Sequence, residues 1–171
     1  GMAASVGTVV HASIEDLLQI DLSHLKPNDT RWLPKLAEDF LKTRWEEEKE
    51  IFFSTPRRPM WKEKEWDKAK RMQRGAIKML LEFVGAKGVT PLKTTVSLWN
   101  NLLSRVIAVE GELRTKDNRL MGRLDMLFAD VGEDGNLNGW IVADLKTGRA
   151  PEGELKPEDQ RQLHLYREIL L

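Results

Sequence analysis

Two acids and a lysine in the second half of the chain have the types and spacing of a site that cleaves phosphodiesters. Asp144 and Lys146 end a short apolar run that begins at Trp140, and residues i and i+2 of a strand project to the same side. Asp125 lies in an apolar run that precedes them. Two carboxylates can hold a divalent metal ion, and a nearby lysine can stabilise charge on a phosphate. The pattern therefore predicts nuclease chemistry.

Each candidate residue also has a purely structural interpretation. An unpaired carboxylate at Asp125 would cost several kcal/mol in so apolar a segment, so an ion pair with Arg123 is the alternative to a metal. Glu110, on the preceding expected strand, either joins the site or is an exposed strand residue. His11 either packs in the first helix or supplies a nitrogen ligand, which would shift the preference from Mg²⁺ toward Mn²⁺. His24 and His164 have no comparable setting.

The composition is that of an ordinary globular domain. The chain has 171 residues, 41% of them hydrophobic and 32% charged, which predicts one domain over residues 1–171. The 27 basic and 27 acidic residues cancel, so affinity for a polyanion must come from local patches. The absence of cysteine excludes disulfides, thiolate zinc sites and iron–sulfur clusters held by this chain. Without a signal peptide or an apolar stretch of about 20 residues, we expect a cytoplasmic or intracellular protein that does not cross a membrane.

Helices are expected to dominate the first half of the chain, residues 7–90. Apolar residues at helical spacing predict helices over residues 8–20, 31–50 and 61–84. The third of these helices ends before Gly85 and carries a basic side, formed by Lys64, Lys68, Arg71, Arg74 and Lys78. This side either binds the phosphates that flank the cleaved bond or is simply solvated.

The second half, residues 91–171, is expected to hold a sheet and one helix. Alternating apolar residues predict a hairpin and a third strand, over residues 106–114, 120–130 and 140–146. A helix is predicted over residues 157–171, where Pro157 suits the first turn. The fold class is thus α+β, with a small, mixed and largely antiparallel sheet flanked by helices.

The ends of the sequence indicate a core taken from a longer protein. Gly1 before Met2 resembles a cloning remnant, and the last expected helix runs to Leu171 without a capping glycine. On that helix Gln162 and Tyr166 are four residues apart and would share a face. They either bind a phosphate or water near the strand ends, or the helix serves packing alone.

Taken in order along the chain, these motifs resemble the RecB-like branch of the PD-(D/E)XK nucleases. That branch includes the nuclease domains of RecB and AddB helicase–nucleases and the CRISPR-associated RecB-like exonucleases. The motifs are Gly7-x-x-x-His11, Gly122-Arg123-Leu124-Asp125, Asp144-Leu145-Lys146-Thr147-Gly148 and Gln162-x-x-x-Tyr166. The resemblance covers residues 7–166 and implies an α/β/α core of the restriction-endonuclease type.

The resemblance also implies a role for each position that matches a motif. His11, Asp125, Asp144 and the carbonyl of Leu145 would bind Mg²⁺ or Mn²⁺, with Lys146 as the catalytic lysine. The residues expected to contact DNA or support the site are Gln162, Tyr166, Glu110, Arg123 and Arg149.

The implied activity is that of a Mg²⁺- or Mn²⁺-dependent deoxyribonuclease, an exonuclease in DNA repair, recombination or nucleic-acid processing. The expected partners are DNA, single strands included, and a helicase or a CRISPR or repair protein. Many relatives hold an iron–sulfur cluster on four cysteines, so this chain either belongs to a cluster-free branch or is part of a longer protein that carries one. The alternative function is a catalytically inactive DNA-binding or scaffold module, and an enzyme for another phosphodiester is a third.

Overall fold

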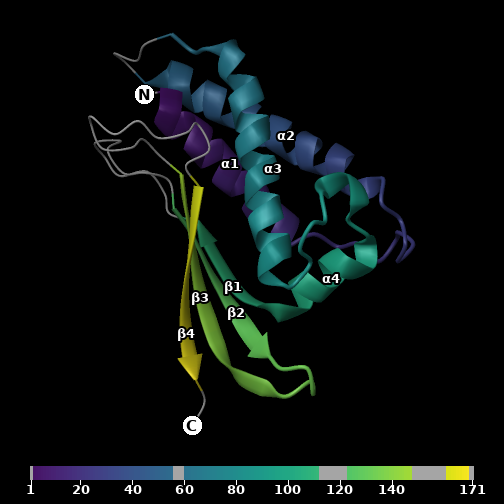
Figure 1. Cartoon of the computed structure of the whole chain (residues 1–171). Coiled ribbons are helices and arrows are strands. Elements are labelled where there is room, and N and C mark those ends of the chain that lie inside the picture. Colours follow the sequence, from purple (N-terminus) through teal and green to yellow (C-terminus); the bar gives the residue numbers. More distant parts are fainter. Residues whose placement is uncertain (1, 56–59, 112–122, 148–160, 170–171) are drawn as a thin grey trace.

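The computed structural model describes residues 2–55, 60–111, 123–147 and 161–169 (Figure 1). For residues 110–111, 123–124, 146–147 and 161–169 it describes the backbone alone. The helices are α1 (Met2–Leu18), α2 (Trp32–Ser54), α3 (Trp66–Phe83) and α4 (Val96–Arg105), with 3₁₀ turns η1 (Glu63–Glu65) and η2 (Pro91–Lys93). The strands are β1 (Val106–Gly111), β2 (Arg123–Val131), β3 (Leu137–Thr147) and β4 (Arg161–Ile169). The predicted α+β class is confirmed.

Helix α1 is the centre of the helical half because it contacts α2, α3 and the strands β1 and β2. Most of its side chains are buried, and those of Val10, Ile14 and Leu17 are completely inaccessible to solvent. Such a helix gains its stability from packing, because it has apolar neighbours on several sides. None of the helices in the described part of the chain is both long enough and apolar enough to cross a membrane.

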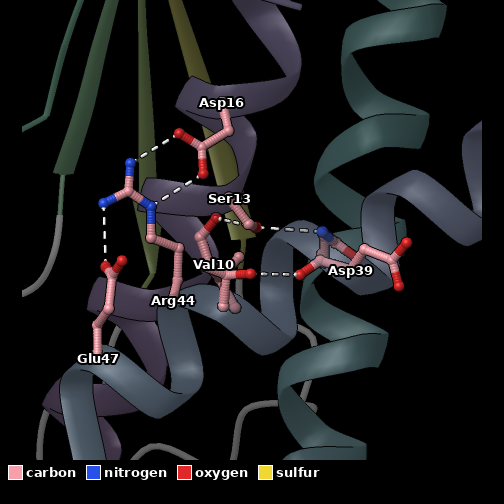
Figure 2. Close-up of polar contacts among 8 residues, drawn as sticks. Val10, Ser13, Asp16, Asp39, Arg44 and Glu47 are labelled. Carbon is pink, nitrogen blue, oxygen red and sulfur yellow. Dashed lines mark hydrogen bonds and ion pairs between the residues drawn. The ribbon is translucent and has the colours of Figure 1, made fainter. Parts of the chain in front are cut away.

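Polar contacts fix the three long helices against one another (Figure 2). Arg44 of α2 forks onto Asp16 of α1, with Nε–Oδ2 and Nη2–Oδ1 distances of 2.9 and 2.7 Å. In the interior, Gln73 of α3 donates from Nε2 to Ser13 Oγ at 3.1 Å and to the Ala37 carbonyl at 2.7 Å. This buried amide therefore joins α1, α2 and α3.

The end of α3 has the geometry that its glycine predicts. Gly85 has a φ of +85°, a conformation that glycine adopts without the steric cost of a Cβ. The Gly85 N–H donates to the Glu82 carbonyl at 3.0 Å and the Ala86 N–H to the Leu81 carbonyl at 2.9 Å. These are the two hydrogen bonds of a Schellman cap, which satisfy carbonyls at the end of the helix.

The sheet is a meander of four antiparallel strands in the order β1-β2-β3-β4. One face belongs to the core and buries Met126, Phe128, Ile141, Ala143 and Leu145. Phe83 of α3 lies against Phe128, with ring centroids 5.0 Å apart. On the opposite face Trp140 and Val142 are each 38% exposed. The predicted hairpin and third strand are confirmed over the described residues, and the part of the hairpin at residues 112–122 lies outside them.

The prediction of a helix over residues 157–171 is wrong for the part that the structure describes. Residues 161–169 form β4, which pairs with β3 from Gly139↔Ile169 to Thr147↔Arg161. Apolar Leu163 and Leu165 recur at every second position, which suits a strand as well as a helix. Pairing with the edge of β3 decides between them, since tertiary context overrides propensity.

Helix α4 was absent from the sequence prediction although its start has a recognisable signal. Thr95 is its N-cap, and its side chain accepts a hydrogen bond from the Leu98 N–H at 3.0 Å. Buried Val96, Trp99 and Leu102 recur at three-residue spacing. Trp99 also donates from Nε1 to the Leu17 carbonyl at 2.9 Å, which connects α4 to the end of α1.

Candidate functional site

Four positions on four strands form a single row across the sheet. The register pairs Glu110 with Asp125, Asp125 with Asp144, and Asp144 with His164. For Glu110 and His164 only the backbone positions are described. We refer to these four positions as the acidic row, and its two central members are the predicted metal-binding acids.

Asp125 and Asp144 lie directly opposite each other on neighbouring strands, β2 and β3. Residues so paired project from the same face, with Cβ atoms about 4.5–5.5 Å apart. Asp144 is 7% exposed and buried, and Asp125 is half-buried. Like charges placed directly opposite destabilise a sheet, so a positive charge between the two carboxylates would relieve the repulsion. A divalent cation with oxygen ligands fits this pair.

Asp125 and Asp144, the central members of the acidic row, lie on the face of the sheet opposite the core. Ala143 and Leu145, which flank Asp144 in sequence, are buried in the core at 0% and 1% exposure. Alternation puts Asp144 on the other side, together with Val142. Val142 is 38% exposed there and Asp144 only 7%. This face is therefore covered at the acids and open two residues away.

The backbone positions of the other predicted site residues fall in neighbouring rows. Lys146 pairs with Arg123 on one side and with Gln162 on the other, and Tyr166 pairs with Val142. The side chains of Lys146, Arg123, Gln162 and Tyr166, like all of Arg149, lie outside what the structure describes.

Gln162 and Tyr166 do not lie on a helix, which corrects the sequence prediction. They occupy β4, where a four-residue spacing separates them by about 13 Å instead of one helical turn. The two side chains therefore cannot meet as they would on a helix. Their backbones instead pair with two separate positions of β3, Lys146 and Val142. The same change of element brings the backbone of His164 opposite Asp144. His164 was not among the predicted site residues, although Gln162, His164 and Tyr166 stand at every second position.

Leu145 lies within the ladder on both of its sides, opposite Leu124 on β2 and Leu163 on β4. Backbone carbonyls of a strand lie in the plane of the sheet and face a neighbouring strand. A carbonyl oxygen keeps a second lone pair after one hydrogen bond. The predicted role of the Leu145 carbonyl as a metal ligand depends on that second lone pair.

His11 is buried in α1 with 4% exposure. Its burial lowers the pKa of the imidazole from 6.5 to about 4, so the ring is neutral at pH 7. A neutral ring is the form that binds a metal. Within the described residues, however, no three histidine, aspartate or glutamate side chains gather into a group that could hold an ion. The structure brings Asp125 and Asp144 together and does not add His11 as a third member.

The basic side of the third helix is present as predicted. Arg71, Arg74 and Lys78 are exposed on α3 and Lys68 is half-buried, while Lys64 precedes them in η1. The opposite side of α3 is buried, through Ala69, Met72, Gln73, Ala76, Ile77, Leu80 and Leu81.

Comparison with known proteins identifies the family. The family model of the PD-(D/E)XK nuclease superfamily matches residues 1–171, the whole chain. No curated protein matches the chain, and no solved structure matches it. Enzymes of this superfamily generally use divalent metal ions, which fits the two opposed carboxylates on β2 and β3. The chain therefore belongs to the PD-(D/E)XK nuclease superfamily.

Proposed function

We propose that this protein is a metal-dependent DNA phosphodiester hydrolase of the RecB-like exonuclease type. The observation that carries the proposal is the direct pairing of Asp125 with Asp144 in the β2–β3 register. Family membership supports the reaction class, and the order of the four sequence motifs supports the RecB-like branch. A role in DNA repair, recombination or nucleic-acid processing follows from that branch. A DNA substrate implies an intracellular site of action beside helicase, CRISPR or repair proteins.

Asp125 and Asp144 would hold Mg²⁺ or Mn²⁺, with the Leu145 carbonyl as a further ligand. Within the described residues His11 does not lie with the two acids, and it would complete the shell when the ion draws the three side chains together. The two carboxylates suit either ion, and an imidazole nitrogen shifts the preference toward Mn²⁺. When bound, the ion polarises a phosphodiester and lowers the pKa of a bound water. Burial of Asp144 at 7% exposure supports this role, because a charge in partly dry surroundings interacts strongly with its partners.

Lys146 stands two positions after Asp144 on β3, which suits a catalytic lysine beside the ligands. A lysine ammonium is a compact point charge, and it would offset the negative charge that grows on the phosphate as the water attacks. Glu110 would assist as an auxiliary acid of the row. The remaining residues would position the DNA around the site: Arg123, Arg149, Gln162 and Tyr166.

The alternative is a catalytically inactive DNA-binding or scaffold module with the same fold. Fold alone does not guarantee activity. Metal-dependent cleavage separates the two functions, because an inactive module would bind DNA and leave it intact in Mn²⁺ as in a chelator.

A digest of linear and circular DNA, each single- and double-stranded, tests the proposal. We expect degradation of the linear forms with Mn²⁺ or Mg²⁺, none in EDTA, and none by an Asp144→Asn variant that keeps the far-ultraviolet circular dichroism of the parent. Absence of cleavage in every metal condition, with DNA binding retained, would establish the inactive module. Cleavage of circular DNA would contradict the exonuclease type.

A further inference from the structure

We propose that the exposed side of α3 is a second nucleic-acid-binding surface, which holds the phosphate backbone away from the acidic row. We call it the basic stripe and define it as Lys68, Arg71, Arg74 and Lys78. The inference rests on the proposed function, because it assumes that the substrate is a nucleic acid. It adds to that function a surface that binds without the metal.

The geometry of the basic stripe follows from its spacing along one helix. Steps of three, three and four residues place its members on one side of α3. The opposite side is buried against the core, for example at Ala69, Ala76 and Leu80 with 0–1% exposure, so the orientation of the helix is fixed. The ten residue steps of helix from Lys68 to Lys78 span about 15 Å, a length that covers several backbone phosphates.

Three charges of the basic stripe, those of Lys68, Arg74 and Lys78, are available to a ligand. Among the residues that the structure describes, no carboxylate forms an ion pair with Lys68, Arg74 or Lys78. Lys70, outside the basic stripe, differs: it pairs with Asp67 at 3.3 Å and lies 5.9 Å from the centre of the Trp66 ring. Arg71 has an interaction of its own, so the argument rests on the other three.

Charge segregation in a neutral chain gives the basic stripe its selectivity for polyanions. The 27 basic and 27 acidic residues cancel overall, yet one open surface of α2 is mainly acidic: Asp39, Glu46, Glu47 and Glu50 line it together with a single lysine, Lys42. A nucleic acid would therefore be attracted to α3 and repelled from α2, an effect set by local potential and not by net charge. The same acids on a second copy of the chain are the competing occupant of the basic stripe.

The test measures binding of a fluorescein-labelled oligodeoxythymidylate in EDTA over a range of KCl concentrations. The stripe variant carries Lys68→Gln, Arg74→Gln and Lys78→Gln. Its matched control carries Lys26→Gln, Lys35→Gln and Lys93→Gln, which removes the same charge from three exposed lysines outside both α3 and the acidic surface of α2. Far-ultraviolet circular dichroism and the thermal midpoint confirm that both variants are folded.

We expect the stripe variant to bind roughly tenfold more weakly at low salt. Each lost phosphate contact to a single strand reduces the slope of log K against log salt by about 0.7, so three lost contacts should reduce its magnitude by about 2. The control should keep the affinity and slope of the parent. Equal binding by the stripe variant and the control would overturn the proposal, even if the parent cleaves DNA in Mn²⁺. If the parent binds DNA without ever cleaving it and the stripe variant loses that binding, the result would support the surface and refute only the proposed function. A dimer of the parent, seen by sedimentation without DNA and lost in the stripe variant, would assign the basic stripe to a second copy and also overturn the proposal.

Discussion

Replacing His11 should remove a pH dependence of folding that its burial creates. The imidazole is 4% exposed, and desolvation lowers its pKa from 6.5 to about 4 in the folded protein. The unfolded chain therefore binds the proton more tightly than the folded one. Stability rises with pH across the window from about 4 to 6.5, and it falls as the solution is acidified through that window.

The size of the effect follows from the two pKa values. The two pKa values differ by about 2.5. Once the pH is below both values, this difference corresponds to a loss of roughly 3 kcal/mol in the free energy of unfolding. Between pH 7 and pH 5 the contribution of His11 to the free energy of unfolding changes by about 2 kcal/mol. With a urea m-value of about 2 kcal/mol per molar, the midpoint would move by about 1 M.

The assay is urea unfolding of the metal-free protein at pH 7 and pH 5, for the parent and for His11→Gln. The glutamine has similar size and cannot titrate, so the variant should lose about 2 kcal/mol less than the parent on acidification. His24→Gln is the control, because His24 is exposed; it should follow the parent. Carboxylates that titrate in the same range cancel in this comparison.

Parallel losses of stability in the parent and in His11→Gln would refute the reasoning. They would mean that the folded protein accommodates a protonated imidazole at position 11 as readily as water does. The neutral ring required of a metal ligand would then have no structural cause.

Three further outcomes are expected. Lys146→Ala should bind Mn²⁺ in calorimetry like the parent but cleave DNA at least roughly a hundredfold more slowly; equal turnover would remove the lysine from the mechanism. Gly85→Ala should lower the free energy of unfolding by about 1 kcal/mol, because its φ is +85° and nothing lies within 4 Å of an added Cβ, so backbone strain is the whole cost. Gly85→Asn should cost less. An unchanged thermal midpoint for the alanine variant would contradict the strain argument. Gln73→Leu should cost about 1–3 kcal/mol in urea unfolding, because it removes the hydrogen bonds to Ser13 and the Ala37 carbonyl; no loss would show that the amide is dispensable.

Periodicity was sufficient to predict the elements that carry the two acids. Apolar residues at helical spacing located α1, α2 and α3, and alternation located β2 and β3. That Asp125 and Asp144 lie directly opposite each other could not be predicted, because register depends on the geometry of the turn as well as on the strands. The short α4 was missed despite its Thr95 cap, since ten residues show few repeats of a helical period.

Strand β4 shows why the local sequence alone could not predict the type of the last element. Residues 162–166 place polar and apolar side chains alternately, and the same residues offer Leu163 and Tyr166 at helical spacing. Both periods fit so short a segment, so the open edge of β3 decides the outcome. The roles predicted for Gln162 and Tyr166 assumed the helix, and the change of element moved them apart. His164 gained a position opposite Asp144 for the same reason.

The turn between β2 and β3 determines whether the two acids meet. It is held by the Gly132 N–H donating to the Asn136 carbonyl at 2.9 Å and by Asp134 Oδ1 accepting from the Asn136 N–H at 2.9 Å. A single residue inserted into this loop would slip the ladder by one position and turn one carboxylate toward the hydrophobic interior. An exchange of the exposed Glu133 side chain should be tolerated, whereas changes in loop length should not. The length of a surface loop remote from the acids thus determines whether the two carboxylates share one face of the sheet.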